Sequence, residues 1–243
     1  MTVEYDGTDF CGYQSQGQGE RTVQDVMAQA LRALCPRETL VLHAAGRTDT
    51  GVHALGQVLS FQTESAIPLE RWAIALNSNL PRDVAVARVE PAPPGFHARF
   101  SARSRTYGYL LWTRRTRSAL WGRYSLHIRS ALDLGAMRSA AALLTGTHDF
   151  AAYARTGEAG QPTVRDLQTL AVRPWTADRV LITATATGFL RSMVRNMVGV
   201  LLAVGKGEMP PSAAQEILDT RDRAQNPCPP AAPQGLFLWR VLY

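Results

Sequence analysis

Cysteine, lysine and long apolar runs are all scarce in this chain of 243 residues. The three cysteines are odd in number, lie far apart and form no C-x-x-C pair, which argues against a disulfide framework and against a zinc site. No apolar run approaches the ~20 residues that a membrane-spanning helix needs, and no basic, apolar leader precedes the first strand-like segment. These absences predict a cytoplasmic protein with reduced cysteines and no membrane partner.

Histidine is also infrequent, with five in the whole chain. None of them forms a ligand spacing such as H-x-x-x-H, so the histidines are more typical of loop or core positions than of a metal centre. We expect no metal centre built on these histidines.

The positive charge of the chain is almost entirely guanidinium, because Lys206 is the single lysine among 26 Lys and Arg. A net charge of +6 and a pI near 9.6 favour a polyanionic partner. Guanidinium groups pair with phosphate oxygens and stack on bases in ways that an ammonium group cannot. GC-biased codons would produce the same excess of arginine, so the positions of the arginines carry more information than their number.

Arginines and aromatic residues are interleaved between residues 96 and 123. The arginines are Arg99, Arg103, Arg105, Arg114, Arg115, Arg117 and Arg123, and the aromatics are Phe96, Phe100, Tyr107, Tyr109, Trp112 and Trp121. Such a segment suits a folded RNA, whose phosphates bind guanidinium groups and whose unstacked bases lie on aromatic rings. The alternative is a strand with core aromatics and solvated arginines.

Periodicity predicts the same order of elements in both halves of the chain. The first half is predicted to contain a strand at 2–5, a helix at 23–34, strands at 40–44 and 58–63, a helix at 69–77 and a strand at 84–89. The second half is predicted to contain a strand at 106–112, a helix at 132–144, strands at 166–172 and 180–186, a helix at 190–204 and a strand at 235–243. A further short helix is predicted after Pro211, ending near Asp219.

Each half therefore has the β-α-β-β-α-β order of the ferredoxin-like unit. We predict an α+β protein with two subdomains, 1–95 and 96–243, separated by the proline-rich segment 91–95. Their sheets are expected to join into one largely antiparallel sheet, with helices on one face and an RNA-binding cleft on the other.

The densest group of polar residues lies in the stretch 43–54, H-A-A-G-R-T-D-T-G-V-H-A, between two apolar runs. Asp49 is the candidate nucleophile, on a loop between strands where catalytic groups are commonly displayed. Arg47 is close enough in sequence to share the site. The alternative is a turn shaped by Gly46 and Gly51 in which Asp49 only accepts backbone N–H bonds.

This stretch, written G-R-T-D-x-G-V-H-A, resembles the tRNA pseudouridine synthases of the A type. The resemblance extends nearly end to end, through Y-D-G-T at 5–8, G-Y-Q at 12–14, T-V-Q at 22–24, N-S-N-L-P at 77–81, F-H-A-R-F at 96–100, Y-G-Y at 107–109, G-T-H-D-F at 146–150 and F-L-R-S-M-V-R-N-M-V-G at 189–199. Two features depart from the family pattern. Tyr13 stands where a tryptophan is usual, and the stretch 161–165 lacks the commoner Arg-Thr-Pro-x-Arg order while keeping Arg165.

The resemblance implies an enzyme that isomerises uridine to pseudouridine at positions 38, 39 and 40 in the anticodon stem-loop of tRNA. It implies that the enzyme works as a homodimer without metal or cofactor. Asp49 would be the nucleophile, attacking either ribose C1′ or uracil C6.

The same resemblance implies roles for further residues. Tyr107 would stack on the uracil and serve as the candidate base for the C5 proton, Arg195 would pair with Asp49, and Arg47 would help to flip the base. The tRNA-contacting residues would be Phe96, His97, Ala98, Arg99, Phe100, Gly157, Gln161, Arg165 and Arg191.

The predicted helix at 190–204 carries Arg191 and Arg195 on one face near its start, where the helix dipole disfavours cations. An anionic partner, either Asp49 or an RNA phosphate, would compensate. The alternative is a pair of surface arginines that flank a core helix.

Two other functions fit parts of the sequence. Asp49-Thr50-Gly51 is also the triplet of aspartic proteases, but the chain has only one, and neighbouring arginines oppose the shared proton that those enzymes need. An RNA-binding module without catalysis, in which Asp49 is only structural, is the stronger alternative.

Overall fold

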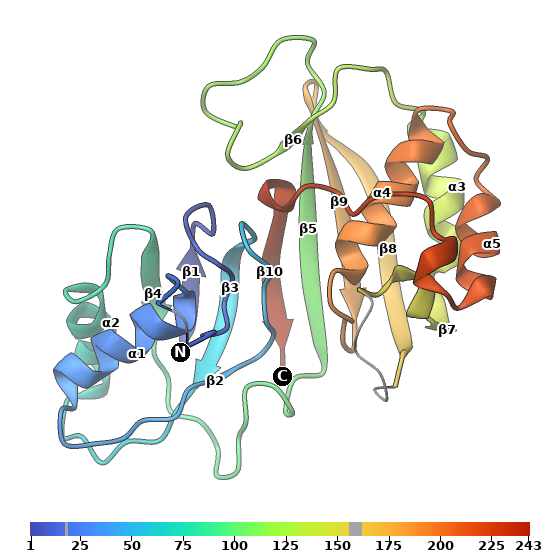
Figure 1. Cartoon of the computed structure of the whole chain (residues 1–243). Coiled ribbons are helices and arrows are strands. Elements are labelled where there is room, and N and C mark those ends of the chain that lie inside the picture. Colours follow the sequence, from blue (N-terminus) through green and yellow to red (C-terminus); the bar gives the residue numbers. More distant parts are fainter. Residues whose placement is uncertain (18, 156–161) are drawn as a thin grey trace. The chain divides into compact units, whose positions relative to one another are not determined.

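A computed structural model describes residues 1–17, 19–155 and 162–243 (Figure 1). The chain forms two compact units: unit 1 contains residues 1–103 and 237–243, and unit 2 contains residues 104–236. The predicted division at residue 95 differs in two respects. Residues 96–103 and the final strand belong to unit 1, because that strand, β10 (Leu236–Leu242), pairs in parallel with β3 (His53–Ser60).

Unit 1 has the β-α-β-β-α-β order that the sequence predicts. Its elements are β1 (Thr2–Tyr5), α1 (Val23–Leu34), β2 (His43–Ala44), β3, α2 (Leu69–Asn77) and β4 (Val84–Arg88), with β10 added from the end of the chain. The strands lie in the order β4-β1-β3, and β1 is antiparallel to both neighbours. The second half of β3 pairs with β2, and its beginning pairs with β10.

Helix α1 forms where its capping and apolar residues place it. The side chain of Thr22 accepts a hydrogen bond from the Asp25 amide, which satisfies one of the free N–H groups of the first turn. Val23, Met27, Ala30 and Leu31 are the buried residues of the helix, at helical spacing. The predicted bounds of α1 and α2 are confirmed.

Unit 2 contains β5 (Ser104–Trp112), β6 (Leu126–His127), α3 (Leu134–Leu144), β7 (Gly146–Asp149), β8 (Val164–Thr176), β9 (Arg179–Ala186), α4 (Met193–Gly205) and α5 (Ala213–Thr220). Short 3-10 turns lie at Ala151–Tyr153, Arg223–Gln225 and Pro233–Gly235. The strands follow the antiparallel order β5-β9-β8-β7, and β6 pairs in parallel with β5. Helix α3 packs on α4, α5 and β8.

The mixed α+β class with mainly antiparallel strands is confirmed. Three predicted elements were misplaced. β2 covers only two residues of the predicted strand 40–44, while β3 begins at His53, five residues before the predicted start. Helix α4 begins at Met193 and not at Leu190, because Ser192 has a left-handed backbone (φ 59°) that a helix cannot continue through. Among the helices in the described ranges, none is both long and apolar enough to cross a membrane.

Candidate active site

Asp49 lies in unit 1 on the loop that connects β2 to β3, and its residue is half-buried. The loop turns directly after it: the Val52 amide donates to the Asp49 carbonyl oxygen at 3.1 Å. Gly51 has a φ of 75°, a conformation that other residues rarely adopt. The turn therefore needs a glycine at this position and presents Asp49 from a fixed backbone.

A second segment, residues 6–13, packs directly against the Asp49 loop. The Tyr13 amide donates to the Thr48 carbonyl oxygen at 3.1 Å, and the Gly51 amide donates to the Phe10 carbonyl oxygen at 3.3 Å. A Cβ atom on Gly7 would lie 2.0 Å from the Val52 carbonyl oxygen, so only glycine allows the two backbones to approach this closely.

Buried polar side chains lie beneath the loop. The Tyr5 hydroxyl is 2.8 Å from Thr48 Oγ1, and Gln57 Nε2 donates to the Gly46 carbonyl oxygen at 2.7 Å and to the Tyr5 hydroxyl at 3.4 Å. All three side chains are at most 7% exposed. Burial raises the pKa of Tyr5 to about 12, although its hydrogen bonds with Thr48 and Gln57 oppose that rise.

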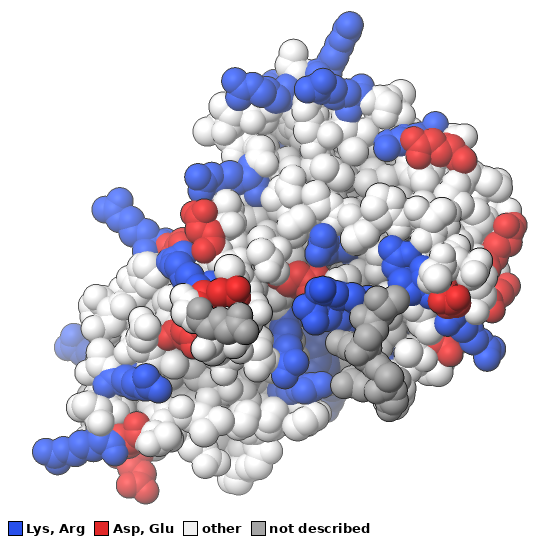
Figure 2. Space-filling model, in the orientation of Figure 1, with Lys and Arg blue, Asp and Glu red and all other residues white. Residues whose placement is uncertain are grey.

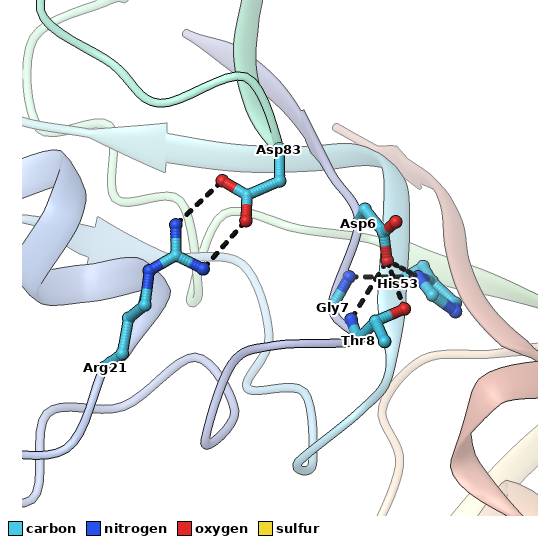
Figure 3. A network of polar contacts seen from close by, with 6 residues as sticks. All are labelled: Asp6, Gly7, Thr8, Arg21, His53 and Asp83. Carbon is cyan, nitrogen blue, oxygen red and sulfur yellow. Dashed lines mark hydrogen bonds and ion pairs between the residues drawn. The ribbon is translucent and has the colours of Figure 1, made fainter. Parts of the chain in front are cut away.

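The start of segment 6–13 is held by the contacts drawn in Figure 3. Asp6 Oδ1 accepts hydrogen bonds from the amide and the hydroxyl of Thr8, and the Gly7 amide donates to Nδ1 of the buried His53 at 2.9 Å. The same Nδ1 lies 3.1 Å from Asp6 Oδ1, a contact that becomes an ion pair only when His53 is protonated. The ring of His53 stacks on Phe237 in β10, with centroids 4.8 Å apart.

Arg21 and Asp83 form the other contact in that view. Both terminal nitrogens of Arg21 reach the two Asp83 oxygens, at 2.7 and 2.8 Å, and the guanidinium lies 4.0 Å from the centroid of the Phe10 ring. This paired geometry joins Arg21 to Asp83, the residue before β4, and places the guanidinium of Arg21 against Phe10 of segment 6–13.

Arg47 is exposed in the Asp49 loop, which leaves its guanidinium accessible to a substrate. The predicted tRNA-contacting segment 96–100 also belongs to unit 1. Ala98 is fully buried and anchors the segment, since its amide donates to Ser60 Oγ and its carbonyl accepts from the Tyr243 hydroxyl.

On either side of Ala98 the segment presents aromatic rings. His97 lies between His43 and Phe100, with centroid distances of 4.2 and 4.4 Å. Phe100 is 75% exposed, and the Arg99 guanidinium lies 5.5 Å from its centroid. An exposed ring beside a guanidinium can accept an unstacked base.

Tyr107 lies in unit 2, in β5, opposite Ala184 of β9. Its side chain is buried to 8% exposure and meets the Phe189 ring edge to face, with centroids 5.1 Å apart and an interplanar angle of 86°. The packing fixes the plane of the phenol ring.

Arg195 lies in the first turn of α4, also in unit 2. Its Nε donates to the Ala231 carbonyl oxygen at 2.8 Å, and the Ala231 amide donates back to the Arg195 carbonyl oxygen at 2.9 Å. The segment around Ala231 thus fixes both the backbone and the guanidinium of Arg195.

The prediction that Arg191 and Arg195 share one helix face is wrong. Arg191 precedes α4, because the left-handed Ser192 separates it from the helix. Arg191 is exposed, and its carbonyl oxygen accepts a hydrogen bond from the Arg155 amide.

The remaining predicted tRNA-contacting residues belong to the 150–165 region. Arg165 lies in β8 opposite His148, and its Nη1 donates to the carbonyl oxygens of Pro162 and Val164. Gly157 and Gln161 lie outside the described residues.

The aromatic residues of the interleaved segment divide between core and surface. Tyr109 and Trp112 are buried, as the alternative of a core strand predicts, whereas Trp121 is half-buried beyond the strand.

Basic side chains gather at the top of Figure 2, over the loop between β5 and β6. Arg179 lies 4.5 Å from the centroid of a Trp121 ring and 4.8 Å from that of Trp175.

No group of three or more His, Cys, Asp or Glu side chains within the described ranges could hold a metal ion. The three cysteines are free thiols, and Cys35 and Cys228 are buried.

Comparison with known proteins decides the family. A sequence model described as tRNA pseudouridine synthase matches residues 1–101 and 140–243. This chain belongs to the tRNA pseudouridine synthase family.

Three relatives, each named tRNA pseudouridine synthase A, match the whole of this chain. The protein of Chromobacterium violaceum is 45% identical and is covered over 92% of its length. The relative from Paraburkholderia phymatum is 44% identical and covered over 90%, and that from Bacillus subtilis is 42% identical and covered over 97%.

The sequence alone assigns no role to Tyr5, Gln57 or His53. A signal existed for Gln57, because an amide in the middle of a strand-like apolar run must find buried partners or lie on the solvent face. No local pattern reveals which loop such a side chain supports, because that depends on the pairing of β1 with β3.

Proposed function

We propose that this protein isomerises uridine to pseudouridine at positions 38, 39 and 40 in the anticodon stem-loop of tRNA, with Asp49 as the covalent nucleophile. The observation that carries the proposal is the placement of Asp49. This half-buried carboxylate lies on a loop fixed by buried hydrogen bonds, in a chain of the tRNA pseudouridine synthase family.

The reaction cleaves the bond between ribose C1′ and uracil N1, turns the uracil, and forms a bond from C1′ to C5. A carboxylate can hold the reacting partner covalently during the turn, by attack on C1′ or on C6. The base must remain in the site, so the enzyme must bind the detached uracil as well as react with it.

The proposed roles draw on both units. Arg195 pairs with Asp49, while Tyr107 stacks on the uracil and removes the C5 proton. Arg47 and the exposed rings and arginines of segment 96–100 bind the flipped nucleotide and its neighbours.

Phosphate and base contacts beyond the site involve the other predicted tRNA-binding residues. Arg165 and Arg191 contribute guanidinium groups, and Gly157 and Gln161 complete the set of proposed tRNA contacts. A homodimer, which the family resemblance implies, and a cytoplasmic location, which the sequence analysis predicts, remain predictions.

The test is tritium release from tRNA labelled with [5-³H]uridine, because exchange of the C5 hydrogen accompanies the new bond. Wild type, Asp49→Ala and Asp49→Asn are compared, with Asp219→Asn on the exposed face of α5 as the matched control. We expect release from wild type and the control, and a loss of at least 10³-fold in both Asp49 variants.

The same experiment separates the alternative function. An RNA-binding module without catalysis predicts that wild type binds tRNA but releases no tritium. Filter binding of the same tRNA at the same salt concentration supplies that comparison, and should give similar Kd values for wild type and Asp49→Asn.

A further inference from the structure

The Asp49 loop rests on a continuous line of buried polar contacts within unit 1. It runs from the Gly46 carbonyl oxygen to Gln57 Nε2 (2.7 Å), from Gln57 Nε2 to the Tyr5 hydroxyl (3.4 Å), and from Tyr5 to Thr48 Oγ1 (2.8 Å). Gly46 and Thr48 flank Arg47, and Thr48 immediately precedes Asp49. The line therefore joins the loop at two points on the N-terminal side of the proposed nucleophile.

Both supporting side chains come from neighbouring strands of the sheet. Tyr5 ends β1 and Gln57 lies within β3, and these strands pair with Tyr5 opposite Ala54. Gln57 Oε1 also accepts the Val58 amide at 3.2 Å, so both ends of its amide are used. Side chains on rigid strands position a site more precisely than side chains on a loop.

The direction of the hydrogen bonds follows from their donors. Gln57 Nε2 can only donate, so the Tyr5 oxygen accepts from it and the Tyr5 hydroxyl hydrogen is free to point toward Thr48. The raised pKa of Tyr5, about 12, keeps that hydrogen in place at neutral pH. The donor-to-acceptor direction of these hydrogen bonds is therefore fixed at neutral pH.

A merely structural role does not require these polar groups. Replacing a buried hydrogen-bonded pair by apolar groups of the same shape is often nearly neutral for stability. What apolar side chains cannot supply is a directional contact to one atom of the loop, and catalysis is sensitive to displacements of about 1 Å.

We propose that Tyr5 and Gln57 are positioning residues that orient the Asp49 carboxylate through Thr48 and Gly46. The inference rests on the proposed function, and it assigns these two side chains a role in the rate of the chemical step. Neither residue touches the substrate in this role.

The experiment uses conservative variants of the full-length protein. Tyr5→Phe removes only the hydroxyl, Gln57→Met removes the amide at nearly constant shape, and Thr48→Val removes the hydroxyl that accepts from Tyr5. Thr48→Ser keeps that hydroxyl and tests rescue. Tyr13→Phe is the matched control, because the Tyr13 hydroxyl is buried and has no hydrogen-bond partner within the described residues.

Tritium release is measured under single turnover and in the steady state at 15 °C, with the Tm of each variant and its Kd for tRNA. We expect Tyr5→Phe, Gln57→Met and Thr48→Val to lower kcat at least tenfold, with KM and Kd within twofold of wild type. Thr48→Ser and Tyr13→Phe should stay within threefold of wild type.

The double variant Tyr5→Phe/Thr48→Val provides a second measurement, since both changes remove the same hydrogen bond. It should be no slower than the slower single variant. Wild-type kcat in Tyr5→Phe and Gln57→Met would overturn the inference, as would rate losses that match the fraction of unfolded protein in each variant.

Failure of the proposed function looks different. In that case wild type itself releases no tritium, and Asp49→Asn does not differ from it. An active wild type, an inactive Asp49→Asn and fully active Tyr5 and Gln57 variants would leave the proposed function intact and reject the positioning role alone.

Discussion

Two buried tyrosines of unit 1 differ in whether their hydroxyls have a partner. Tyr5 makes hydrogen bonds to Thr48 and Gln57, whereas the hydroxyl of Tyr13 has none within the described part of the chain. A buried polar group without a partner costs roughly 1–3 kcal/mol. The family pattern has a tryptophan at the position of Tyr13. The site therefore accommodates the aromatic ring of Tyr13 better than its hydroxyl.

Tyr13→Phe is therefore expected to raise the free energy of unfolding by about 1 kcal/mol, because it removes the unpaired hydroxyl and keeps the ring. Urea unfolding at pH 7.5 measures the change, and Tyr5→Phe should lose stability in the same assay. A lower urea midpoint for Tyr13→Phe would mean that the hydroxyl is satisfied, for instance by a bound water.

Tyr107→Phe tests the proposed base at the same scale. The substitution retains the ring that packs on Phe189 and removes the hydroxyl. General base catalysis contributes about 10²–10⁴-fold, so kcat for tritium release should fall by at least 10²-fold while the Kd for tRNA changes little. Tyr153→Phe, at a buried tyrosine of unit 2 whose hydroxyl donates to the Ala214 carbonyl oxygen, is the control for loss of a buried tyrosine hydroxyl. Equal effects of the two variants would reject a special role for Tyr107.

At the level of elements, the segment 228–232 clamps the start of α4. A Cβ atom on Gly199 would lie 2.3 Å from the Pro229 carbonyl oxygen. Since Ala231 binds both the backbone and the guanidinium of Arg195, this close approach places the proposed partner of Asp49. A glycine is therefore needed at position 199 because any side chain would collide with Pro229, and not because of its backbone dihedral angles.

Gly199→Ala should destabilise the protein by about 1–3 kcal/mol, because the added methyl forces the segment away from the helix. The rate of tritium release should fall as well, since Arg195 loses its anchor. Thermal unfolding and the isomerisation assay at 15 °C check both effects. The matched control is Gly135→Ala on the exposed side of α3, where the nearest atom is Asp133 Oδ1 at 3.1 Å, a side-chain atom and not backbone, and which should lower the Tm much less than Gly199→Ala does. Equal Tm values for the two variants would contradict the claim that the segment 228–232 holds α4 in place.

Elements with strong local signals were predictable from the sequence, and those that depend on partners were not. Helix α1 has a capping threonine and a clear apolar stripe, which made its bounds predictable, and the structure confirms them. β3 begins at His53, where burial beside Phe237 and the bond from Gly7 create a strand that no local apolar run indicates. The same holds for the site: the position of Asp49 on a loop between strands could be predicted, but its support by Tyr5 and Gln57 arises from strand pairing.

At the scale of the whole molecule, the stability of both units depends on pH through their buried tyrosines. Burial raises the pKa of Tyr5 to about 12 and raises the pKa of Tyr13, Tyr109 and Tyr153 as well. Two of these residues belong to unit 1 and two to unit 2. In each case the folded state favours the neutral phenol more strongly than the unfolded chain does, where a tyrosine has a pKa near 10.

The sign of the pH dependence follows from that difference. Below pH 10 a tyrosine is protonated in both states, and its contribution to stability is fully present. Between pH 10 and about 12 the unfolded chain loses the proton and the folded state keeps it, so the free energy of unfolding falls by about 1.4 kcal/mol per pH unit for each buried tyrosine. Arginine remains charged throughout this range, so the loss does not come from broken arginine ion pairs.

We therefore expect the urea midpoint to change much less from pH 8 to 9.5 than above pH 10, where it should fall steeply. At pH 11 the free energy of unfolding should be lower by roughly 5 kcal/mol if all four tyrosines contribute. Phenolate absorbance at 295 nm should show these tyrosines ionising only when the protein unfolds. Tyr5→Phe should reduce the slope above pH 10 by about a quarter, because one of the four linked groups is gone. Ionisation of more than three of the seven tyrosines in a protein that stays folded at pH 11 would mean that these buried phenols reach solvent, and the loss of stability above pH 10 would then disappear.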